Sequence, residues 1–105
     1  MPSPVENHIT INVRTTEFQE LTNQLDELLV LLRRSNEIAG ESRDQLIAEI
    51  KAGRALLEAP KTDPKLVDLF LRRPLRFICK TGSGAIIGVA ATAALALLGK
   101  VTGLW

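Results

Sequence analysis

The sequence contains very few of the side chains that most enzymes use. Its 105 residues include one cysteine, one histidine and no tyrosine, and aromatic residues make up only 4% of the chain. One cysteine cannot form a disulfide within the chain, and one histidine supplies neither a histidine-based metal site nor the usual catalytic triad. His8 stands in a polar N-terminal stretch with no acid–base partner nearby in the sequence. We therefore expect no catalytic residues, no cofactor and no metal site.

Acidic residues are missing from the last third of the chain. Residues 1–68 carry eight basic residues and all twelve acidic ones, a balance of −4, whereas residues 69–105 carry five basic residues and no acid, a balance of +5. Such asymmetry is typical of contact with a membrane or a nucleic acid. Because almost no aromatic residues accompany the basic ones for base stacking, we expect a lipid bilayer and no nucleic acid as a partner.

Residues 81–99 form an uncharged, largely apolar run of nineteen residues. A helix of that length covers roughly 28 Å, which is close to the hydrocarbon core of a bilayer. The sequence therefore predicts a single-pass membrane protein, and the excess of basic residues before the run predicts a cytoplasmic N-terminus. The residues expected at the membrane interface are Arg72, Arg73, Arg76, Lys80, Lys100 and Trp105.

Small residues dominate this run and leave a second interpretation open, in which it forms an alanine-rich helix in the core of a soluble cytoplasmic bundle. Small residues at every fourth position lie on one helix face, where a second helix could approach closely. The sequence thus predicts a helix-packing seam in the membrane, although a segment this rich in glycine and alanine can show the spacing by chance. The seam consists of Gly84, Gly88, Thr92 and Ala96.

Residues 16–59 are predicted to form a cytoplasmic helical or coiled-coil region. A capping box at residues 16–19 begins the helix, and apolar residues follow at alternating steps of three and four. Gly40 either ends this helix, which gives a helical hairpin with a second helix to about Glu58, or lies within one continuous rod. The predicted oligomerisation seam consists of Phe18, Leu21, Leu25, Leu28 and Leu32.

The remaining segments complete a mainly α fold. Residues 1–15 are predicted to be a flexible tail with a lone strand over 9–13, which must pair with another copy, pair with a partner or stay irregular. Residues 60–80 are predicted to contain a proline-rich break and then a basic amphipathic helix, capped by Asp63, that lies among lipid headgroups. Residues 81–105 form the C-terminal hydrophobic helix and a short tail.

Two resemblances follow from this architecture. The heptad from Phe18 to Leu32, with the run Gly84-Ala85-Ile86-Ile87-Gly88 near the end, resembles the small phage haemolysin or holin-type membrane proteins. The stretch from Arg43 to Leu75, with the alanine-rich end, is similar to small helical modules of bacterial conflict and defence systems. The first resemblance implies a lysis factor that assembles in a bilayer, and the second implies an effector module.

Three functions remain open, and none is enzymatic. The first is a homo-oligomer that permeabilises or remodels a bilayer through its C-terminal helix. The second is a membrane-tethered adaptor that docks a protein partner on residues 16–58. The third is a fully soluble helical oligomer whose last helix belongs to the core.

Overall fold

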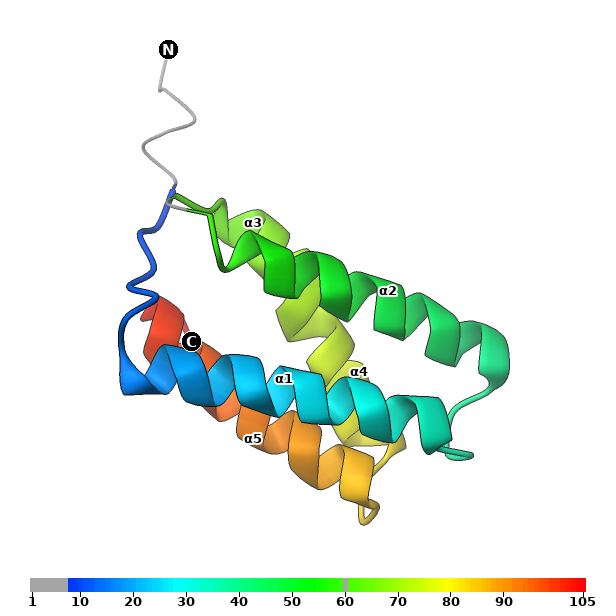
Figure 1. Ribbon diagram of the computed structural model, residues 1–105. Helices are drawn as coiled ribbons and strands as arrows, with labels where there is room; N and C mark the ends of the chain where they lie inside the picture. The colour runs from blue at the N-terminus through cyan, green and yellow to red at the C-terminus, as the bar shows by residue number, and fades with distance from the viewer. Residues whose placement is uncertain (1–7, 60) are drawn as a thin grey trace.

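The computed structural model describes residues 8–59 and 61–105, and it confirms a mainly α-helical chain. Residues 1–7 of the predicted flexible tail, and Pro60 of the predicted break, lie outside the described residues. A π-helical turn joins α3 to α4, so these three elements form one continuous helical segment (Figure 1). The elements are α1 (Thr16–Arg34), α2 (Gly40–Leu56), α3 (Pro64–Val67), the π-helical turn η2 (Asp68–Arg72), α4 (Arg73–Thr81) and α5 (Ile86–Thr102).

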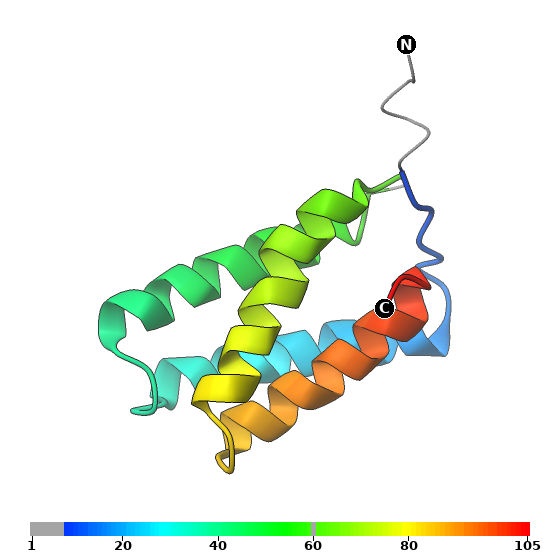
Figure 2. The same ribbon diagram turned by 180° about the vertical axis from the view of Figure 1, so that it is seen from behind.

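Successive helical segments run back and forth to form a small bundle. α2 runs antiparallel to α1, the α3–η2–α4 segment returns, and α5 lies alongside α1 in both views (Figures 1 and 2). The most extensive packing joins α5 to α1 and to α4, whereas α2 packs on η2 and on α1. The last helix is therefore part of the bundle and covers both the first helix and α4.

The core consists mainly of leucine and isoleucine. A side chain of this kind contributes roughly 1.5–3 kcal/mol when it is fully buried. All five residues of the predicted oligomerisation seam are buried in this core. They pack against other residues of the same chain, so a contact between copies has to use other side chains. The largest fully buried side chains are Leu21, Leu25, Leu28, Leu32, Ile50, Leu57, Val67, Leu71, Leu75, Ile78 and Leu98.

The cap of α1 lies one residue before the predicted one. Thr15 is the N-cap, and its hydroxyl oxygen accepts a 3.1 Å hydrogen bond from the Phe18 N–H. The prediction that Thr16 caps the helix was therefore wrong. At the other end, Arg33 and Arg34 lie in the last turn, where positive charge stabilises the helix dipole. α1 then ends at Arg34, and residues 35–39 connect it to α2, so the two are separate helices.

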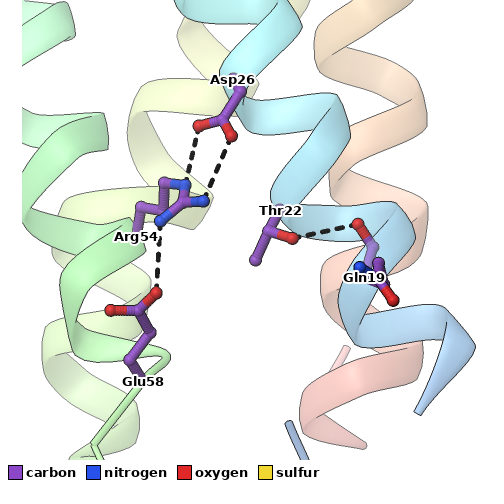
Figure 3. A network of polar contacts seen from close by, with 5 residues as sticks. All are labelled: Gln19, Thr22, Asp26, Arg54 and Glu58. Carbon is purple, nitrogen blue, oxygen red and sulfur yellow. Dashed lines mark hydrogen bonds and ion pairs between the residues drawn. The ribbon is translucent and has the colours of Figure 1, made fainter. Parts of the chain in front are cut away.

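A polar cluster ties α2 to α1 (Figure 3). Arg54 Nε lies 2.8 Å from Asp26 Oδ1, and Arg54 Nη2 donates a 3.2 Å hydrogen bond to Asp26 Oδ2. Arg54 Nη1 also donates a 3.4 Å hydrogen bond to Glu58 Oε1. Beside this cluster the Thr22 hydroxyl donates to the Gln19 carbonyl oxygen at 3.0 Å. Within residues 8–59 and 61–105, Arg54–Asp26 is the ion pair that joins two different helices.

The predicted strand over residues 9–13 is wrong for the part of the chain that the structure describes. Ile9 and Thr62 form a single antiparallel bridge, in which their backbone groups exchange hydrogen bonds of 2.8 and 2.9 Å. Ile11 is buried in the core, which explains one apolar position of the alternating pattern. Because Ile9 pairs within the chain, the predicted strand no longer argues for an oligomer.

The predicted membrane-spanning helix over residues 81–99 is also wrong. Within the described residues, no helix combines the length and the apolar character needed to cross a membrane. Residues 82–85 form a turn with Gly84 at φ +85°, so α5 begins at Ile86 and has 17 residues. Because the predicted spanning helix is wrong, the predicted single-pass topology with a cytoplasmic N-terminus is wrong as well. The face of α5 that is buried in the bundle includes Ile87, Ala90, Ala91, Ala94 and Leu98.

Candidate functional site

α2 approaches the α3–η2–α4 segment most closely at Gly53. A Cβ at this position would overlap the Leu71 side chain and would lie 2.8 Å from the carbonyl oxygen of Phe70, so the approach requires a glycine. From this contact α2 and α4 diverge towards the N-terminal end of α2 (Figure 2, α2 in green and α4 in yellow). The divergence leaves a V-shaped groove of about 450 Å³ between the two helices.

The π-helical turn explains how α4 continues the segment in spite of a proline. In a regular α-helix Pro74 would donate no hydrogen bond, and its ring would clash with the carbonyl group four residues earlier. In η2 the Arg73 N–H bonds instead to the Asp68 carbonyl oxygen, five residues back. The Asp68 carboxylate also accepts hydrogen bonds from Arg72 at 3.3 Å and from Arg73 at 2.9 Å. π turns of this kind occur frequently at functional sites.

The groove has an apolar floor and one apolar wall, which η2 and α4 supply. Leu46 of α2 and Pro74 of α4 are buried at its base. Leu69 and Phe77 line it while remaining 43% and 47% exposed. Single exposed apolar side chains are normal on a protein surface, but several that line one hollow mark a binding surface.

The two edges of the groove carry opposite charge. Glu41 and Glu49 lie on the α2 edge, and Arg73 lies on the α4 edge. Lys80 follows Arg73 by seven residues, which places it on the same face of α4, and it is exposed. Among the described residues Glu41, Glu49 and Lys80 form no ion pair, whereas Arg73 is paired with Asp68 at 2.9 Å. The acidic edge therefore carries the unpaired charges that line the groove.

The residues predicted for a membrane interface lie in several different places. The guanidinium of Arg72 stacks on the Trp105 ring at 4.9 Å from its centroid, a cation–π contact between η2 and the C-terminal end. Lys100 is exposed near the end of α5. Of the predicted interface residues, Arg72, Arg73 and Trp105 line one hollow of about 470 Å³. The exposed basic residues of α4 are Arg73, Arg76 and Lys80.

Two of the four small residues in the predicted packing seam serve a contact within the chain. Gly88 is buried against the Gly82 carbonyl, where a Cβ would overlap the backbone. The Thr92 hydroxyl donates a 2.8 Å hydrogen bond to the Gly88 carbonyl oxygen and lies 3.4 Å from Cys79 Sγ of α4. Gly84 belongs to the turn before α5, and Ala96 is exposed. The structure nevertheless brings all four seam residues together, because they line one surface hollow of about 430 Å³ beside α4.

The described residues show no arrangement of ligands for a metal. Residues 8–59 and 61–105 contain no group of three or more His, Cys, Asp or Glu side chains close enough to hold an ion. His8 and Cys79 are each half-buried in separate regions of the chain.

The residues of the α2 edge were not singled out from the sequence. Glu41, Gln45 and Glu49 follow one another at four-residue steps, which is the sequence signal for one helix face. That signal did not distinguish them from ordinary solvent-facing charges, because the groove exists only where α2 leaves α4.

Comparisons of the chain with protein-family models, with curated proteins and with solved structures give no match. The fold and the site define a small helical bundle with an amphipathic groove between α2 and α4.

Proposed function

We propose that this chain is a non-catalytic adaptor that binds an amphipathic helix of another polypeptide in the groove between α2 and α4. The observation that carries the proposal is the exposure of Leu69 and Phe77 on one wall of a groove whose other edge carries Glu41 and Glu49. An amphipathic helix places its apolar side in such a groove, and its flanking polar residues contact the two edges.

The dimensions of the groove agree with a short helical ligand. Leu69 and Phe77 are eight residues apart, which corresponds to roughly 12 Å along a helix axis. A ligand of about two turns would cover both side chains, with apolar anchors at positions i, i+3 or i+4, and i+7. Glu41 and Glu49, which form no ion pair among the described residues, then favour a ligand with basic residues on the flank that faces α2.

This proposal develops the adaptor interpretation of the sequence and changes its binding surface. That interpretation placed a partner on residues 16–58, whereas here α2 supplies one wall and η2 and α4 supply the other. The interpretation as a bilayer-permeabilising oligomer required residues 81–99 to span a membrane, and it is not retained because no described helix meets that requirement.

Site-specific photo-crosslinking in the native cells tests the proposal. A photo-reactive side chain replaces Gln45, which lines the groove, or Lys51, which is exposed on the same helix and does not line it. We expect a defined protein adduct from position 45 and none from position 51. The adduct from position 45 should disappear when Phe77→Glu is added. Equal adducts from both positions, or no adduct from position 45, would overturn the proposal.

A further inference from the structure

We infer that the end of the bundle at the turn between α4 and α5 binds the surface of an anionic lipid bilayer. The inference goes beyond the proposed function, because none of the residues that carry it lines the groove between α2 and α4. Two exposed apolar side chains, Ile86 and Val89, enter the headgroup region, and the basic residues around them contact lipid phosphates. Binding of this kind occurs at the membrane surface and requires no helix that crosses it.

The apolar side chains at this end are unusually exposed. Ile86 is 71% exposed and Val89 is 69% exposed, and the next large apolar side chain among the described residues is Val13 at 48%. Both belong to the first four residues of α5, where the neighbouring Ile87 is buried in the core. Single exposed apolar residues are normal, but neighbouring ones that form a patch mark an interaction surface.

The surface beside Val89 carries no charge. Val89, Ala93 and Ala96 belong to the hollow of about 430 Å³ beside α4, and none of the residues that line it has a charged side chain. When this surface meets the acyl chains and glycerol groups of a bilayer, no charged group has to lose its hydration. The uncharged hollow therefore extends the patch that Ile86 and Val89 begin.

Unpaired basic side chains border the patch on two sides. Arg34 lines the hollow of about 410 Å³ that also contains Ile86. Lys80, exposed near the end of α4, directly follows a residue that lines the hollow beside Val89. Arg76 is exposed one helical turn before Lys80 on the same face of α4. Within the described part of the chain these three basic residues form no ion pair.

The charge around the patch is positive on balance. Glu37 is the one acidic residue among those that line the two hollows. Residues 69–105, which include α4 and α5, contain no acid at all. An excess of unpaired cations around an apolar patch complements a membrane leaflet that contains anionic phospholipids, and this charge complementarity identifies the partner.

The position of the patch favours a bilayer over a protein partner. The turn at residues 82–85 is the lowest point of the bundle in both views, between α4 in yellow and α5 in orange (Figures 1 and 2). α5 begins at Ile86, directly after this turn. Apolar side chains that stand out at one end of a molecule can enter a deformable bilayer, whereas a protein partner would need a pocket that matches them. Surfaces of this kind bind membranes through apolar burial and attraction to anionic lipids together.

Co-sedimentation of the full chain with lipid vesicles tests the inference. The native chain should pellet with vesicles that contain phosphatidylserine and stay in solution with vesicles of phosphatidylcholine alone. Arg34→Gln/Lys80→Gln should weaken binding to the phosphatidylserine vesicles roughly 10- to 30-fold, because two attractive charges are lost. Ile86→Ser/Val89→Ser should weaken it by about tenfold or more, because the apolar contact is lost.

Matched controls change the same kinds of side chain elsewhere on the bundle. Lys51→Gln/Lys61→Gln removes two exposed positive charges, and Val13→Ser/Leu66→Ser removes two exposed apolar side chains. Both controls should bind the phosphatidylserine vesicles as tightly as the native chain. Circular dichroism should show equal helix content in all variants, so that a loss of binding cannot come from unfolding.

A dye that brightens in apolar surroundings reports whether the patch enters the bilayer. In a Cys79→Ser background, a dye on Val89→Cys should brighten when phosphatidylserine vesicles are added, and a dye on Lys51→Cys should not. The inference is wrong if the native chain does not bind these vesicles, if Ile86→Ser/Val89→Ser binds them as tightly, or if the dye at position 89 does not brighten. Binding to soluble polyglutamate without binding to vesicles would assign this end to an acidic protein instead.

Discussion

Gly53 of α2 lies directly against Leu71 of the π-helical turn, and this contact is the point from which α2 and α4 diverge. A Cβ on Gly53 would lie 2.6 Å from Leu71 Cδ2, closer than two carbon atoms can approach without a shift. The contact holds one end of the groove closed. The shape of the groove therefore depends on a glycine at this position of α2.

Gly53→Ala should destabilise the bundle. Alanine is favoured over glycine within a helix by about 0.5–1 kcal/mol, but overpacking of a buried contact costs about 1–3 kcal/mol, so we expect a net loss. Urea unfolding followed by circular dichroism measures the change. Gly40→Ala is the control in the same helix, because its Cβ would meet Arg43 Nη2 at an ordinary 3.9 Å. Equal free energies of unfolding for the two variants would contradict the close contact.

Gly88→Ala should disturb the turn that connects α4 to α5. The new methyl group would collide with the Gly82 carbonyl, which belongs to backbone and cannot rotate away as a side chain can. We expect a loss of about 1–3 kcal/mol in the free energy of unfolding. Ala96→Leu, at an exposed position of the same predicted seam, should change that free energy by less than about 0.5 kcal/mol. If the two variants have the same stability, the seam does not pack as described.

Leu28→Ala should unfold the chain more readily without acting on an interface between copies. Leu28 is fully buried, and truncation of such a leucine costs about 2–5 kcal/mol. Val30→Ala, two residues away on a half-exposed side chain, should cost far less. Thermal and urea unfolding measure both variants. A Leu28→Ala variant with native stability but altered mass in solution would show instead that the leucine seam joins separate chains.

The ion pair between Arg54 and Asp26 should contribute modestly to the docking of α2 on α1. The Asp26 side chain is 55% exposed, so water weakens the attraction, and we expect a coupling energy of about 0.2–1 kcal/mol. A double-mutant cycle with Arg54→Gln and Asp26→Asn measures it, and added salt should reduce it. The same cycle with Arg54 and Glu58 gives the matched comparison. A zero coupling for Arg54 with Asp26 would show that the pair does not hold the helices together.

The helices could be predicted from the sequence where periodicity and breaks agree. The apolar steps from Phe18 to Leu32 define α1, and Asp63-Pro64 begins α3, where the Asp63 carboxylate accepts a 2.9 Å hydrogen bond from the Lys65 N–H. Both signals are local, because they depend on spacing along one helix and on the cap at its end.

The place of the last helix could not be predicted in the same way. An uncharged run rich in alanine and glycine suits a membrane span, and it equally suits a helix that packs closely inside a bundle. The difference depends on the turn at residues 82–85, which shortens the helix, and on contacts with α1 and α4.

The groove could not be predicted from the sequence for a related reason. Its residues come from separate helical segments, and the packing of α2 on α1 and on η2 determines how far apart they lie. From the sequence alone, Leu69 and Phe77 therefore cannot be distinguished from ordinary apolar residues of an amphipathic helix.

Thiol labelling at position 45 is the measurement that tests the central claim most directly. In a Cys79→Ser background, Gln45→Cys places a reactive thiol in the groove, and Lys51→Cys places one at an exposed position of α2 that does not line it. In the native cells a bound partner should cover the groove. The labelling rate at position 45 should therefore be several-fold lower in cells than in the purified protein, while the rate at position 51 is the same in both. Equal rates in cells and in the purified protein at both positions would contradict the account.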